Sequence, residues 1–386
     1  MPKIDKIETI ILDMPTIRGH VLSMTTMTTQ SMVIVQLRFD DGSVGYGEGT
    51  SIGGMSYGPE SPESIKLAID QYIAPLLLGQ DGDRINLSID LMDQSVKGNP
   101  IARCAVETAL WDGLARRLNV SVAQLFGGVV NSSMPVAWTL ASGNSEIDIA
   151  EAQQMIDLQR HNIFKLKIGK RPVQEDVAHV GRIANALGES ASIRVDVNQA
   201  WSLREARWGL RGLQEIGVDL VEQPIRGALT DQLRTLTNAY EIAVMADEAL
   251  CGPVSAQAVA AARSADVFAI KIAQSGGLKR AAEVIAIAQS AGIDLYAGTM
   301  LEGGLGTAAA LQVFSTVPRL EWGTELFGPL LLRDDILAEP ITYANFAVHL
   351  PEGPGLGVAL DHDKIDHFRR DRGKRTHGTA ALSLPS

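Results

Sequence analysis

The sequence has few cysteines and no long apolar run. Cys104 and Cys251 are the only cysteines among 386 residues, and they stand far apart without a Cys-x-x-Cys motif. Two such cysteines are most simply reduced core residues of a cytosolic protein, not a disulfide framework. No run reaches the ~18 apolar residues that a membrane span needs. The first ten residues also lack the charged-then-apolar pattern of a signal peptide, so we expect a cytoplasmic protein.

Positive charge is also scarce. The chain has 34 Lys and Arg residues against 45 Asp and Glu residues, a net charge of −11. This balance argues against nucleic acid or an anionic membrane as a partner. An anionic substrate would therefore need a site that supplies its own positive potential through lysines and a cation. With 46% hydrophobic and 20% charged residues, the composition is that of an ordinary globular protein with ample core.

Between residues 163 and 273, short apolar runs each end in charged residues. The runs read FKLKIG, VDVN, LVEQP, MADE and FAIKIA. Their charged residues recur about every 25 residues, as in repeated strand–helix units; they are Lys165, Lys167, Asp196, Glu222, Asp247 and Lys271. Charged residues at the C-terminal ends of successive parallel strands converge at the mouth of a β/α barrel, where active sites lie. The pattern predicts an α/β barrel with these residues in its site.

The rest of the barrel follows the same pattern. We expect its first strand at residues 134–143 and its last at residues 320–329, with Glu325 near the end of the last. The runs between them are rich in Val, Ile, Leu and Ala, as in a parallel sheet that is covered on its outside. The chain is long enough for a barrel of about 250 residues and a second region.

The N-terminal region predicts a separate α+β domain. It contains three antiparallel strands, residues 4–13, 31–40 and 43–48, and three helices, residues 62–78, 84–96 and 100–118. Two loops, residues 16–30 and 47–58, are predicted to be lids over a pocket, since mobile loops commonly exclude water from active sites. After Pro329 the chain returns to strand-like segments that we expect to join this domain. The basic and small residues of 370–386 predict a disordered tail.

Lys165 and Lys167 lie two residues apart on one predicted strand, so their side chains point to the same face. A Lys-x-Lys pair on a protein surface is generally more common, but these lysines lie within an apolar strand whose inward face they must form. Two ammonium groups so close together, and partly buried, should lower the pKa of one lysine toward a value that suits proton transfer. Lys271 repeats the feature from the sixth strand, roughly opposite the second.

Asp196, Glu222 and Asp247 each end an apolar strand. Three carboxylates at successive strand ends repel one another unless they share a cation. Oxygen ligands alone select a hard divalent ion, Mg²⁺ or Mn²⁺, with Asn198 and Glu248 in supporting positions. Lysines on either side of such a cation suit the transfer of a proton next to a carboxylate, because the cation holds the charge of the resulting enediolate.

These motifs, in this order, resemble the muconate-lactonising branch of the enolase superfamily, the mandelate racemase/muconate lactonizing enzyme family. The resemblance covers nearly the whole chain and includes MPTIRGH (14–20), TSIGGMSYG (50–58), AWTLASG (137–143), GTMLEG (298–303) and WGTELFGPLLL (322–332). It implies an α/β fold with a modified TIM barrel, (β/α)₇β, at residues 131–325. An α+β capping domain of residues 1–130 would be completed by a C-terminal segment, residues 326–386.

The resemblance also implies an activity and its requirements. The reaction would be the reversible cycloisomerisation of cis,cis-muconate to muconolactone, in catechol degradation, through a metal-stabilised enediolate. The cofactor would be Mn²⁺ or Mg²⁺, the substrate a small dicarboxylate, and the assembly a homo-oligomer such as an octamer.

Site residues carry over one by one from the family's motifs. Lys167 would protonate the enolate carbon, Lys165 would tune Lys167, and Lys271 would face them. Glu325 would hydrogen-bond the substrate carboxylate at the metal. The metal ligands would be Asp196, Glu222 and Asp247, and the residues that bind substrate or shape the pocket would be His20, Ile52, Tyr57, Asn198 and Phe327. Gly19 and Ala249 stand where the family usually has Pro and Ser, and Gly19 would loosen the lid.

Other members of the superfamily offer alternatives. A chlorinated muconate is the nearest alternative substrate. An o-succinylbenzoate synthase or a dipeptide epimerase would share the lysines and carboxylates but not AWTLASG or TSIGGMSYG so closely. A non-catalytic barrel is disfavoured because no ligand or lysine is missing. A phosphate-binding barrel, suggested by GTMLEGGLG after the seventh strand, is disfavoured because the carboxylates already occupy that mouth.

Overall fold

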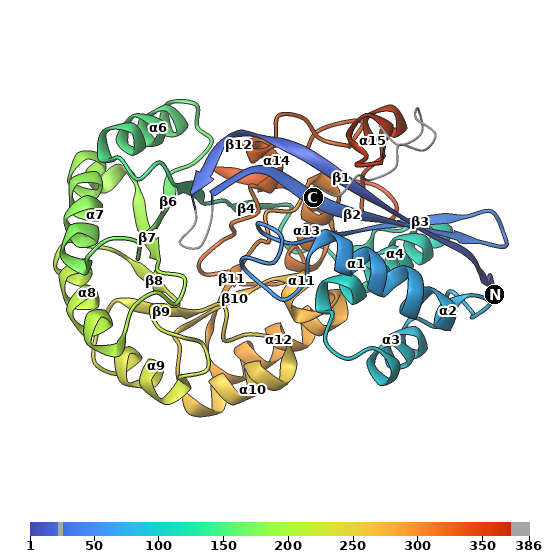
Figure 1. The fold of residues 1–386 in the computed structure, drawn as a ribbon, viewed down its shortest axis with the longest axis horizontal. Helices are drawn as coiled ribbons and strands as arrows, with labels where there is room; N and C mark the ends of the chain where they lie inside the picture. Colours follow the sequence, from blue (N-terminus) through green and yellow to red (C-terminus); the bar gives the residue numbers. More distant parts are fainter. Residues whose placement is uncertain (22–25, 372–386) are drawn as a thin grey trace, which may run out of the picture.

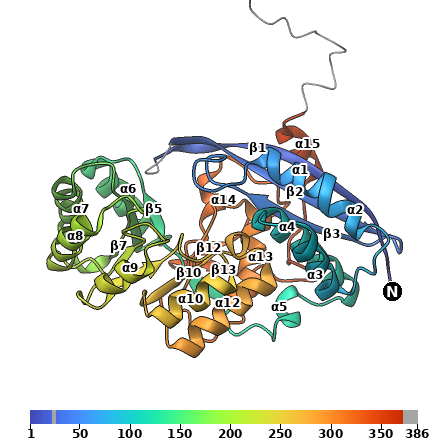
Figure 2. The ribbon, with the colours of Figure 1, turned by 60° about the horizontal axis from the view of Figure 1, so that its bottom comes forward.

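The protein has a curled parallel sheet at one end and an antiparallel sheet with its own helices at the other (Figures 1 and 2). The computed structural model describes residues 1–21 and 26–371. The expected disorder of the tail falls almost wholly on residues 372–386, which lie outside the described residues. Arg370 is fixed, since it pairs with Asp13 at 2.7 Å. Within the described ranges, no helix combines the length and apolar character that crossing a membrane requires.

Seven parallel strands form the barrel wall, each paired with the next in chain order. They are β5 (Trp138–Leu140), β6 (Ile163–Lys167), β7 (Ser192–Asp196), β8 (Leu220–Glu222), β9 (Ala243–Ala246), β10 (Val267–Ile270) and β11 (Asp294–Ala297). The outer helices are α6 (Ser145–Asp157), α7 (Val173–Leu187), α8 (Leu203–Glu215), α9 (Thr230–Thr237), α10 (Pro253–Ala262) and α12 (Leu278–Ala291). The next helix, α13 (Gly304–Phe314), is buried between the barrel and the cap, where it contacts β3. Two short helices, η2 (Gly188–Ser190) and α11 (Ile272–Ser275), complete the connections. The predicted parallel barrel is confirmed.

The register of the strands brings their charged ends side by side. Lys167 of β6 pairs with Asp196, the last residue of β7. Asp196 in turn pairs with Glu222, the last residue of β8. Asp247 and Lys271 directly follow β9 and β10. Because parallel strands end at the same edge of the sheet, this edge carries both lysine and carboxylate groups.

The barrel closes without the eighth strand predicted at residues 320–329. Thr324 alone forms parallel bridges there, to Val136 before β5 and to Ala297 at the end of β11. Its neighbours also bond to the sheet, since the Trp322 and Glu325 N–H groups donate to the Leu295 and Ala297 carbonyls and the Thr324 N–H donates to the Pro135 carbonyl. The predicted ten-residue strand is therefore too long, and the short segment of residues 322–325 joins the two edges of the sheet.

The cap is an antiparallel sheet packed against helices. Its strands are β1 (Ile4–Val21), β2 (Thr26–Phe39) and β3 (Val44–Thr50), and its helices are α1 (Pro62–Ala68), η1 (Ile69–Ile73, a π-helix), α2 (Ala74–Leu77), α3 (Ile85–Ser95), α4 (Pro100–Leu118) and α5 (Val122–Leu125). The prediction of a loop at residues 16–30 is wrong for most of its length. β1 and β2 continue as a paired ribbon in which His20 is opposite Met27, because threonine and branched residues favour extended backbone. In the second predicted loop, residues 47–50 belong to β3.

The far end of this ribbon is held by residues that follow the barrel. Thr16 forms an antiparallel bridge with Leu332. The backbone N–H of Arg333 donates to the Pro15 carbonyl at 2.9 Å, and Arg333 Nε donates to the Thr16 carbonyl at 3.1 Å. The part of β1 that leads to His20 is therefore fixed by the segment after the last barrel strand.

The C-terminal segment divides between the two units. Its elements are α14 (Gly328–Leu331), β12 (Tyr343–Ala344), β13 (Ala347–His349) and α15 (His362–Phe368). β13 pairs with β4 (Ser133–Pro135), at the entry to the barrel, and not with the cap sheet. The expectation that these strands join the cap is therefore wrong, since their backbone partners lie at the start of the barrel. α15 does contact β1 (Figure 1).

Gly47 of β3 lies directly against α4, and we expect Gly47→Ala to destabilise the protein by about 3 kcal/mol. A Cβ at this position would lie 2.0 Å from the Ala105 carbonyl oxygen, so the strand and the helix would have to separate. Urea unfolding measures the change. At Gly58 no atom lies within 4 Å of an added Cβ, so Gly58→Ala is the control and should change stability by less than about 0.5 kcal/mol. An unchanged midpoint for Gly47→Ala would contradict this packing.

Candidate active site

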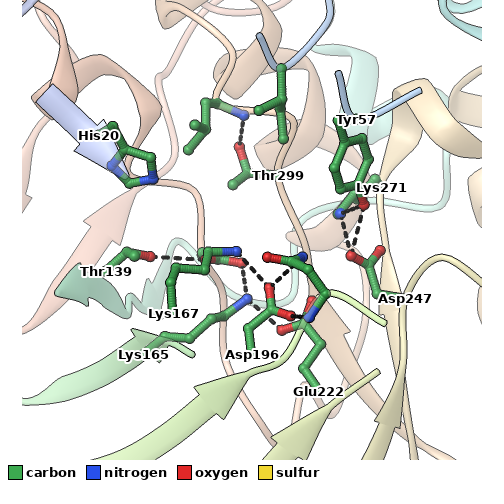
Figure 3. Close-up of a pocket in the computed structure, with 14 residues that line it drawn as sticks. His20, Tyr57, Thr139, Lys165, Lys167, Asp196, Glu222, Asp247, Lys271 and Thr299 are labelled. Atoms are coloured by element: carbon green, nitrogen blue, oxygen red, sulfur yellow. Dashed lines mark hydrogen bonds and ion pairs between the residues drawn. The ribbon is translucent and has the colours of Figure 1, made fainter. Parts of the chain in front are cut away.

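A small pocket lies where the charged strand ends meet the cap (Figure 3). Its lining residues come from both units: His20, Ile52, Tyr57, Thr139, Lys165, Lys167, Asp196, Asn198, Glu222, Asp247, Lys271, Thr299, Leu301 and Glu325. The structure thus brings together every predicted site residue except Phe327. Lys165 and Lys167 lie on one side of the pocket, and Lys271 lies on the other.

Lys165 and Lys167 both reach the pocket from β6, and each pairs with carboxylates. Lys167 Nζ lies 2.5 Å from Asp196 Oδ2. Lys165 Nζ lies 2.5 Å from Glu222 Oε2 and also pairs with Glu325. The Lys165 side chain is only 1% exposed, whereas that of Lys167 is 14% exposed. Lys167 is therefore the better placed of the two to touch a bound molecule.

The pKa of Lys167 is raised above its ordinary value, against the prediction. Burial opposes the positive charge, and Lys165 lowers the pKa of Lys167 as expected. The charge of Asp196 raises it more strongly than Lys165 lowers it, and Glu325 and Glu222 add to this effect. The predicted net lowering is wrong because the neighbouring carboxylates could not be weighed from spacing alone. Lys167 is consequently protonated at neutral pH, which is the form that donates a proton.

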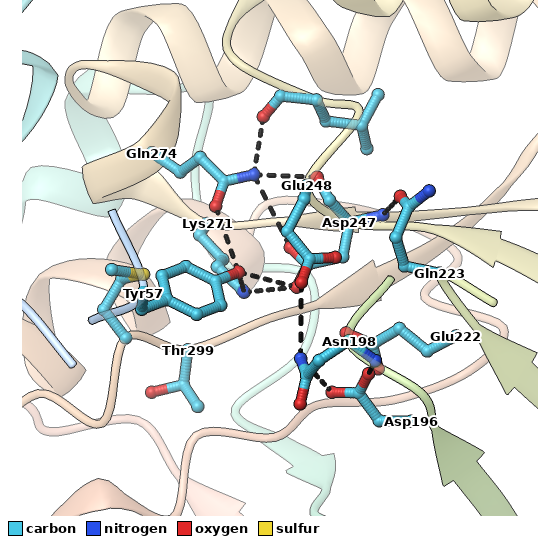
Figure 4. A network of polar contacts seen from close by, with 12 residues as sticks. Tyr57, Asp196, Asn198, Glu222, Gln223, Asp247, Glu248, Lys271, Gln274 and Thr299 are labelled. Atoms are coloured by element: carbon cyan, nitrogen blue, oxygen red, sulfur yellow. Dashed lines mark hydrogen bonds and ion pairs between the residues drawn. The ribbon is translucent and has the colours of Figure 1, made fainter. Parts of the chain in front are cut away.

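Lys271, Asp247 and Tyr57 form a closed set of contacts on the opposite side (Figure 4). Lys271 Nζ donates to Asp247 Oδ2 at 2.6 Å and to Tyr57 Oη at 2.7 Å. Tyr57 Oη donates to the same Asp247 oxygen at 2.8 Å, and Gln274 Nε2 donates to the Asp247 carbonyl at 2.8 Å. A tyrosine from the cap thus bonds directly to two charged groups of the barrel.

Negative charge exceeds positive charge in this part of the structure. Burial, followed by the charge of Asp196, raises the pKa of Glu222 well above its usual range. Burial also raises the pKa of Glu248 to about 8, with further contributions from Asp247 and Asp196. Asn198 Nδ2 joins the two sides, since it donates to Asp196 at 3.1 Å and to Glu248 at 3.3 Å. Buried carboxylates with raised pKa values favour an additional cation.

The oxygen donors at this edge of the barrel are of the kind that a divalent cation prefers. As they stand, no three His, Cys, Asp or Glu side chains of residues 1–21 and 26–371 lie close enough together to hold a metal ion. Two buried oxygens, Asn198 Oδ1 and Glu248 Oε2, lack a hydrogen-bond partner in this part of the chain. Glu222 Oε2 contacts Lys165 Nζ but outside hydrogen-bond geometry. Oxygen donors of this kind suit Mg²⁺ or Mn²⁺.

The cap places His20 over the pocket as a neutral imidazole. Burial, then the charges of Lys167 and Arg18, lowers the pKa of His20 to about 3. The position of the strand is fixed by Arg18, whose Nη2 donates to Glu151 at 2.8 Å and to the Thr139 carbonyl at 3.1 Å. A neutral ring beside Lys167 can hydrogen-bond an anionic ligand without adding charge.

Three pocket residues were not predicted, and one prediction lies elsewhere. Thr139, Thr299 and Leu301 line the pocket, and Thr139 Oγ1 donates to Glu325 at 3.1 Å. A polar residue at the end of the first barrel strand was the available signal for Thr139. Phe327 does not line the pocket, because it packs against the Trp138 ring with 5.0 Å between centroids.

His161 should make the protein sensitive to acid. Its ring is buried, stacks on Trp138 at 5.2 Å and has Nδ1 3.0 Å from the Val136 carbonyl. Burial lowers the pKa of His161 from 6.5 to about 4. The unfolded chain therefore binds the proton first, and stability falls as the pH drops from 6.5 toward 4, by about 2 kcal/mol between pH 7 and pH 5.

Urea unfolding at these two pH values tests this expectation. His161→Gln can still donate to the Val136 carbonyl but does not titrate, so its stability should depend less on pH than that of the wild type. Equal pH dependence in the two proteins would show that His161 does not contribute.

The fold and the site together define an enolase-type barrel enzyme. Residues 148–364 match the enolase C-terminal domain-like family model. Residues 6–127 match the N-terminal domain of the mandelate racemase/muconate lactonizing enzymes. The chain belongs to the mandelate racemase/muconate lactonizing enzyme family, in the enolase superfamily, as the sequence predicted. It is an isomerase, and enzymes of this superfamily use a divalent metal.

Relatives match over almost the entire chain. A muconate cycloisomerase of Acinetobacter lwoffii is 55% identical over 96% of this chain and 97% of its own length. A chloromuconate cycloisomerase of Cupriavidus necator is 47% identical over 95% of this chain and 99% of its own. The muconate lactonizing enzyme of Pseudomonas fluorescens, solved with muconolactone, has 50% identity and a TM-score of 0.95 over 96% of this chain and 100% of its own. The predicted modified TIM barrel with a capping domain is confirmed.

Proposed function

We propose that the protein is a muconate cycloisomerase, which interconverts cis,cis-muconate and muconolactone. One observation carries this proposal: Lys165 and Lys167 face Lys271 across a single pocket that also holds buried carboxylates. Such a pocket offers positive charge to both ends of a dicarboxylate and a lysine for proton transfer. The names of similar proteins, a muconate cycloisomerase and a muconate lactonizing enzyme, support the choice of substrate.

Asp196, Glu222 and Asp247 would hold the cation, Mn²⁺ or Mg²⁺. They end neighbouring strands and offer only oxygen donors. When bound, the cation would supply positive charge where a substrate carboxylate gains negative charge. Asn198 would keep Asp196 and Glu248 oriented through its two hydrogen bonds.

Lys167 would carry the proton. In the direction of lactone formation, an oxygen of one carboxylate bonds to the farther carbon of the double bond that adjoins the other carboxylate. The electron pair of that double bond moves to the carbon next to the second carboxylate, and Lys167 Nζ protonates this carbon. The dianion and one proton give a lactone with one carboxylate. The partial exposure of Lys167 allows solvent to restore its proton.

The other charged groups would position the substrate. Lys165 would set the potential around Lys167, and Lys271 would face the reacting carbons from the opposite wall. Glu325, which is bonded by Thr139 Oγ1 at 3.1 Å and paired with Lys165, would lie beside the substrate carboxylate. His20 would close the pocket from the cap.

The apolar part of the pocket suits a carbon chain with no substituent. Ile52 of the cap and Leu301 of the barrel line the pocket and would contact the diene. A chlorinated muconate is the second candidate substrate, because chloromuconate cycloisomerases are 47% identical to this chain over nearly their full length.

An ultraviolet assay with a panel of dienedioates tests the proposal. The conjugated diene of muconate absorbs, and its lactone does not. We expect the Mn²⁺-loaded protein to consume cis,cis-muconate with a kcat/KM about tenfold or more above that for 2-chloromuconate, the discrimination that one added group typically allows. A preference for the chlorinated diene would favour the second candidate. No reaction with either diene, together with turnover of an N-acyl amino acid or a dipeptide, would contradict both.

We also propose a cytoplasmic homo-oligomer whose chain divides into a cap of residues 1–130, a barrel of residues 131–325 and a returning segment from residue 326. Light scattering on the eluted protein measures the subunit number, and a monomer would contradict the proposed assembly.

A further inference from the structure

One wall of the pocket is a loop, residues 299–303, that follows the last barrel strand. Thr299 and Leu301 of this loop line the pocket. Leu301 has a φ of 60°, a conformation that a leucine adopts only where its surroundings enforce it. Within the loop, Thr299 Oγ1 accepts from the Leu301 N–H at 2.8 Å (Figure 3). Glu302 of the same loop also accepts from the Thr299 hydroxyl and from the Met300 N–H, the latter at 2.9 Å. Further support comes from the cap.

Gln30, on β2 of the cap, donates hydrogen bonds to carbonyl groups of this loop. Its side chain is buried, and Nε2 donates to the Met300 carbonyl at 3.1 Å and to the Leu301 carbonyl at 3.0 Å. The two N–H groups of this one amide thus donate to consecutive carbonyls. The two peptide units that flank Leu301 are thus held by a residue that does not itself line the pocket.

Glu48, on β3, accepts hydrogen bonds from N–H groups at the end of the same loop and in the helix that follows it. Oε1 accepts from the Gly303 N–H at 2.7 Å, and Oε2 accepts from the Gly306 N–H at 2.8 Å. Thr50 Oγ1 also donates to Oε1 at 2.6 Å. A Cβ on Gly306 would lie 2.8 Å from the Glu302 Cβ and 3.1 Å from the Glu48 carboxyl carbon, so glycine leaves room for both side chains. Glu48 is buried and does not line the pocket.

We propose that Gln30 and Glu48 are positioning residues for the reaction. Acting together through the backbone of residues 299–303, they set where Leu301 and Thr299 meet the substrate, and so help to choose between an unsubstituted and a substituted muconate. This inference rests on the proposed function. Neither residue touches the substrate, and a role limited to joining the cap to the barrel would leave the choice of substrate unchanged.

Gln30→Met tests the first contact, because methionine has nearly the same size and no donors. We expect the KM for cis,cis-muconate to rise at least about fivefold, and the kcat/KM ratio of muconate to 2-chloromuconate to change at least about threefold, with Mn²⁺ present. Gln312→Met is the matched control. Gln312 is equally buried and bonds the Leu356 carbonyl at 3.1 Å, away from the pocket, so its loss should lower stability only.

Glu48→Gln tests the second contact, and Glu107→Gln is its control. Both carboxylates are fully buried, and burial raises the pKa of each to about 7. Both reach from the cap to the first turn of a barrel helix, since Glu107 accepts from the Lys279 N–H at 2.8 Å. Only the Glu48 variant should change the ratio between the two dienes. If both pairs of variants lowered activity in proportion to stability, with the ratio constant, the inference would be overturned.

Hydrogen–deuterium exchange of residues 300–306 provides a readout that needs no substrate. These amides should exchange at least about tenfold faster in Gln30→Met and Glu48→Gln than in the wild type and both controls. Faster exchange in the two variants, with a wild type that leaves both dienes untouched, would mean that the proposed function fails while the positioning of the loop stands. Unchanged exchange, or an active wild type whose variants keep the same KM and ratio, overturns the inference.

Discussion

Replacing Lys167 with alanine is expected to lower kcat by about 10²-fold or more, because removal of a general acid–base group typically costs 10²–10⁴-fold. KM should change much less, since Lys165 and Lys271 keep their charges and still attract the substrate. Lys167 is the partly exposed lysine of β6, and its pKa is raised by Asp196 despite burial. It is therefore charged and accessible, as a proton donor must be. Steady-state kinetics with cis,cis-muconate measure the effect.

The control for this variant is Lys170→Ala. Lys170 lies three residues further along the chain and is exposed, so its removal changes the net charge equally without touching the pocket. Solvent exchange during the reverse reaction gives a second readout, since only the residue that carries the proton controls deuterium incorporation next to the carboxylate. If Lys167→Ala kept most of its kcat while Lys165→Ala lost it, the two lysines would have to exchange roles.

Removal of divalent cations is expected to abolish activity, and Mn²⁺ or Mg²⁺ should restore it. Glu222→Gln should weaken the binding of Mn²⁺ at least about tenfold, because it removes one charged oxygen ligand from an all-oxygen set. Titration calorimetry with Mn²⁺ measures the affinity directly, independent of turnover. The structural reason is that the buried carboxylates outnumber the lysines, so a cation would relieve their repulsion. Burial and the charge of Asp196 accordingly raise the pKa of Glu222.

An exposed carboxylate provides the matched control for this measurement. Glu215, at the end of α8, is exposed, and Glu215→Gln removes the same charge at a distance from the site. Its Mn²⁺ affinity should equal that of the wild type. Full activity after exhaustive chelation, or an unchanged affinity in Glu222→Gln, would show that these carboxylates pair with the lysines and do not bind a metal.

The sequence predicted those site residues whose charge contrasts with the apolar strand around them. A lysine or a carboxylate inside an apolar strand is costly unless a function retains it, so Lys165, Asp196 and Lys271 could be recognised before any coordinates. Thr299 and Leu301 escaped prediction for the converse reason, since nothing in their residue type distinguishes them from ordinary barrel residues, and Thr139 offered only its polarity within the first barrel strand. Their presence in the pocket depends on backbone geometry, such as the positive φ of Leu301.

The errors in the fold arose where pairing over long distances decides the outcome. Residues 16–30 lack the hydrophobic alternation of a strand, yet His20 of β1 pairs with Met27 of β2 beyond an irregularity after Pro15, and Thr16 bridges to Leu332. Residues 320–329 have the apolar pattern of a strand, but only residues 322–325 bond to the neighbouring strands. The net pKa of Lys167 likewise depends on the distance to Asp196, which no spacing along the chain reveals.

The contact between the ribbon and the segment after the barrel has a consequence for synthesis. Domains generally fold as units while the chain leaves the ribosome, N-terminal parts first. Here the strand that carries His20 is made near the start, but its anchors, Leu332 and Arg333, are made only after every barrel strand. Arg18 of the same strand bonds to barrel residues that are made earlier, Thr139 and Glu151, so the strand that carries His20 gains its contacts in two stages. A chain that ends before Leu332 lacks the second set of anchors.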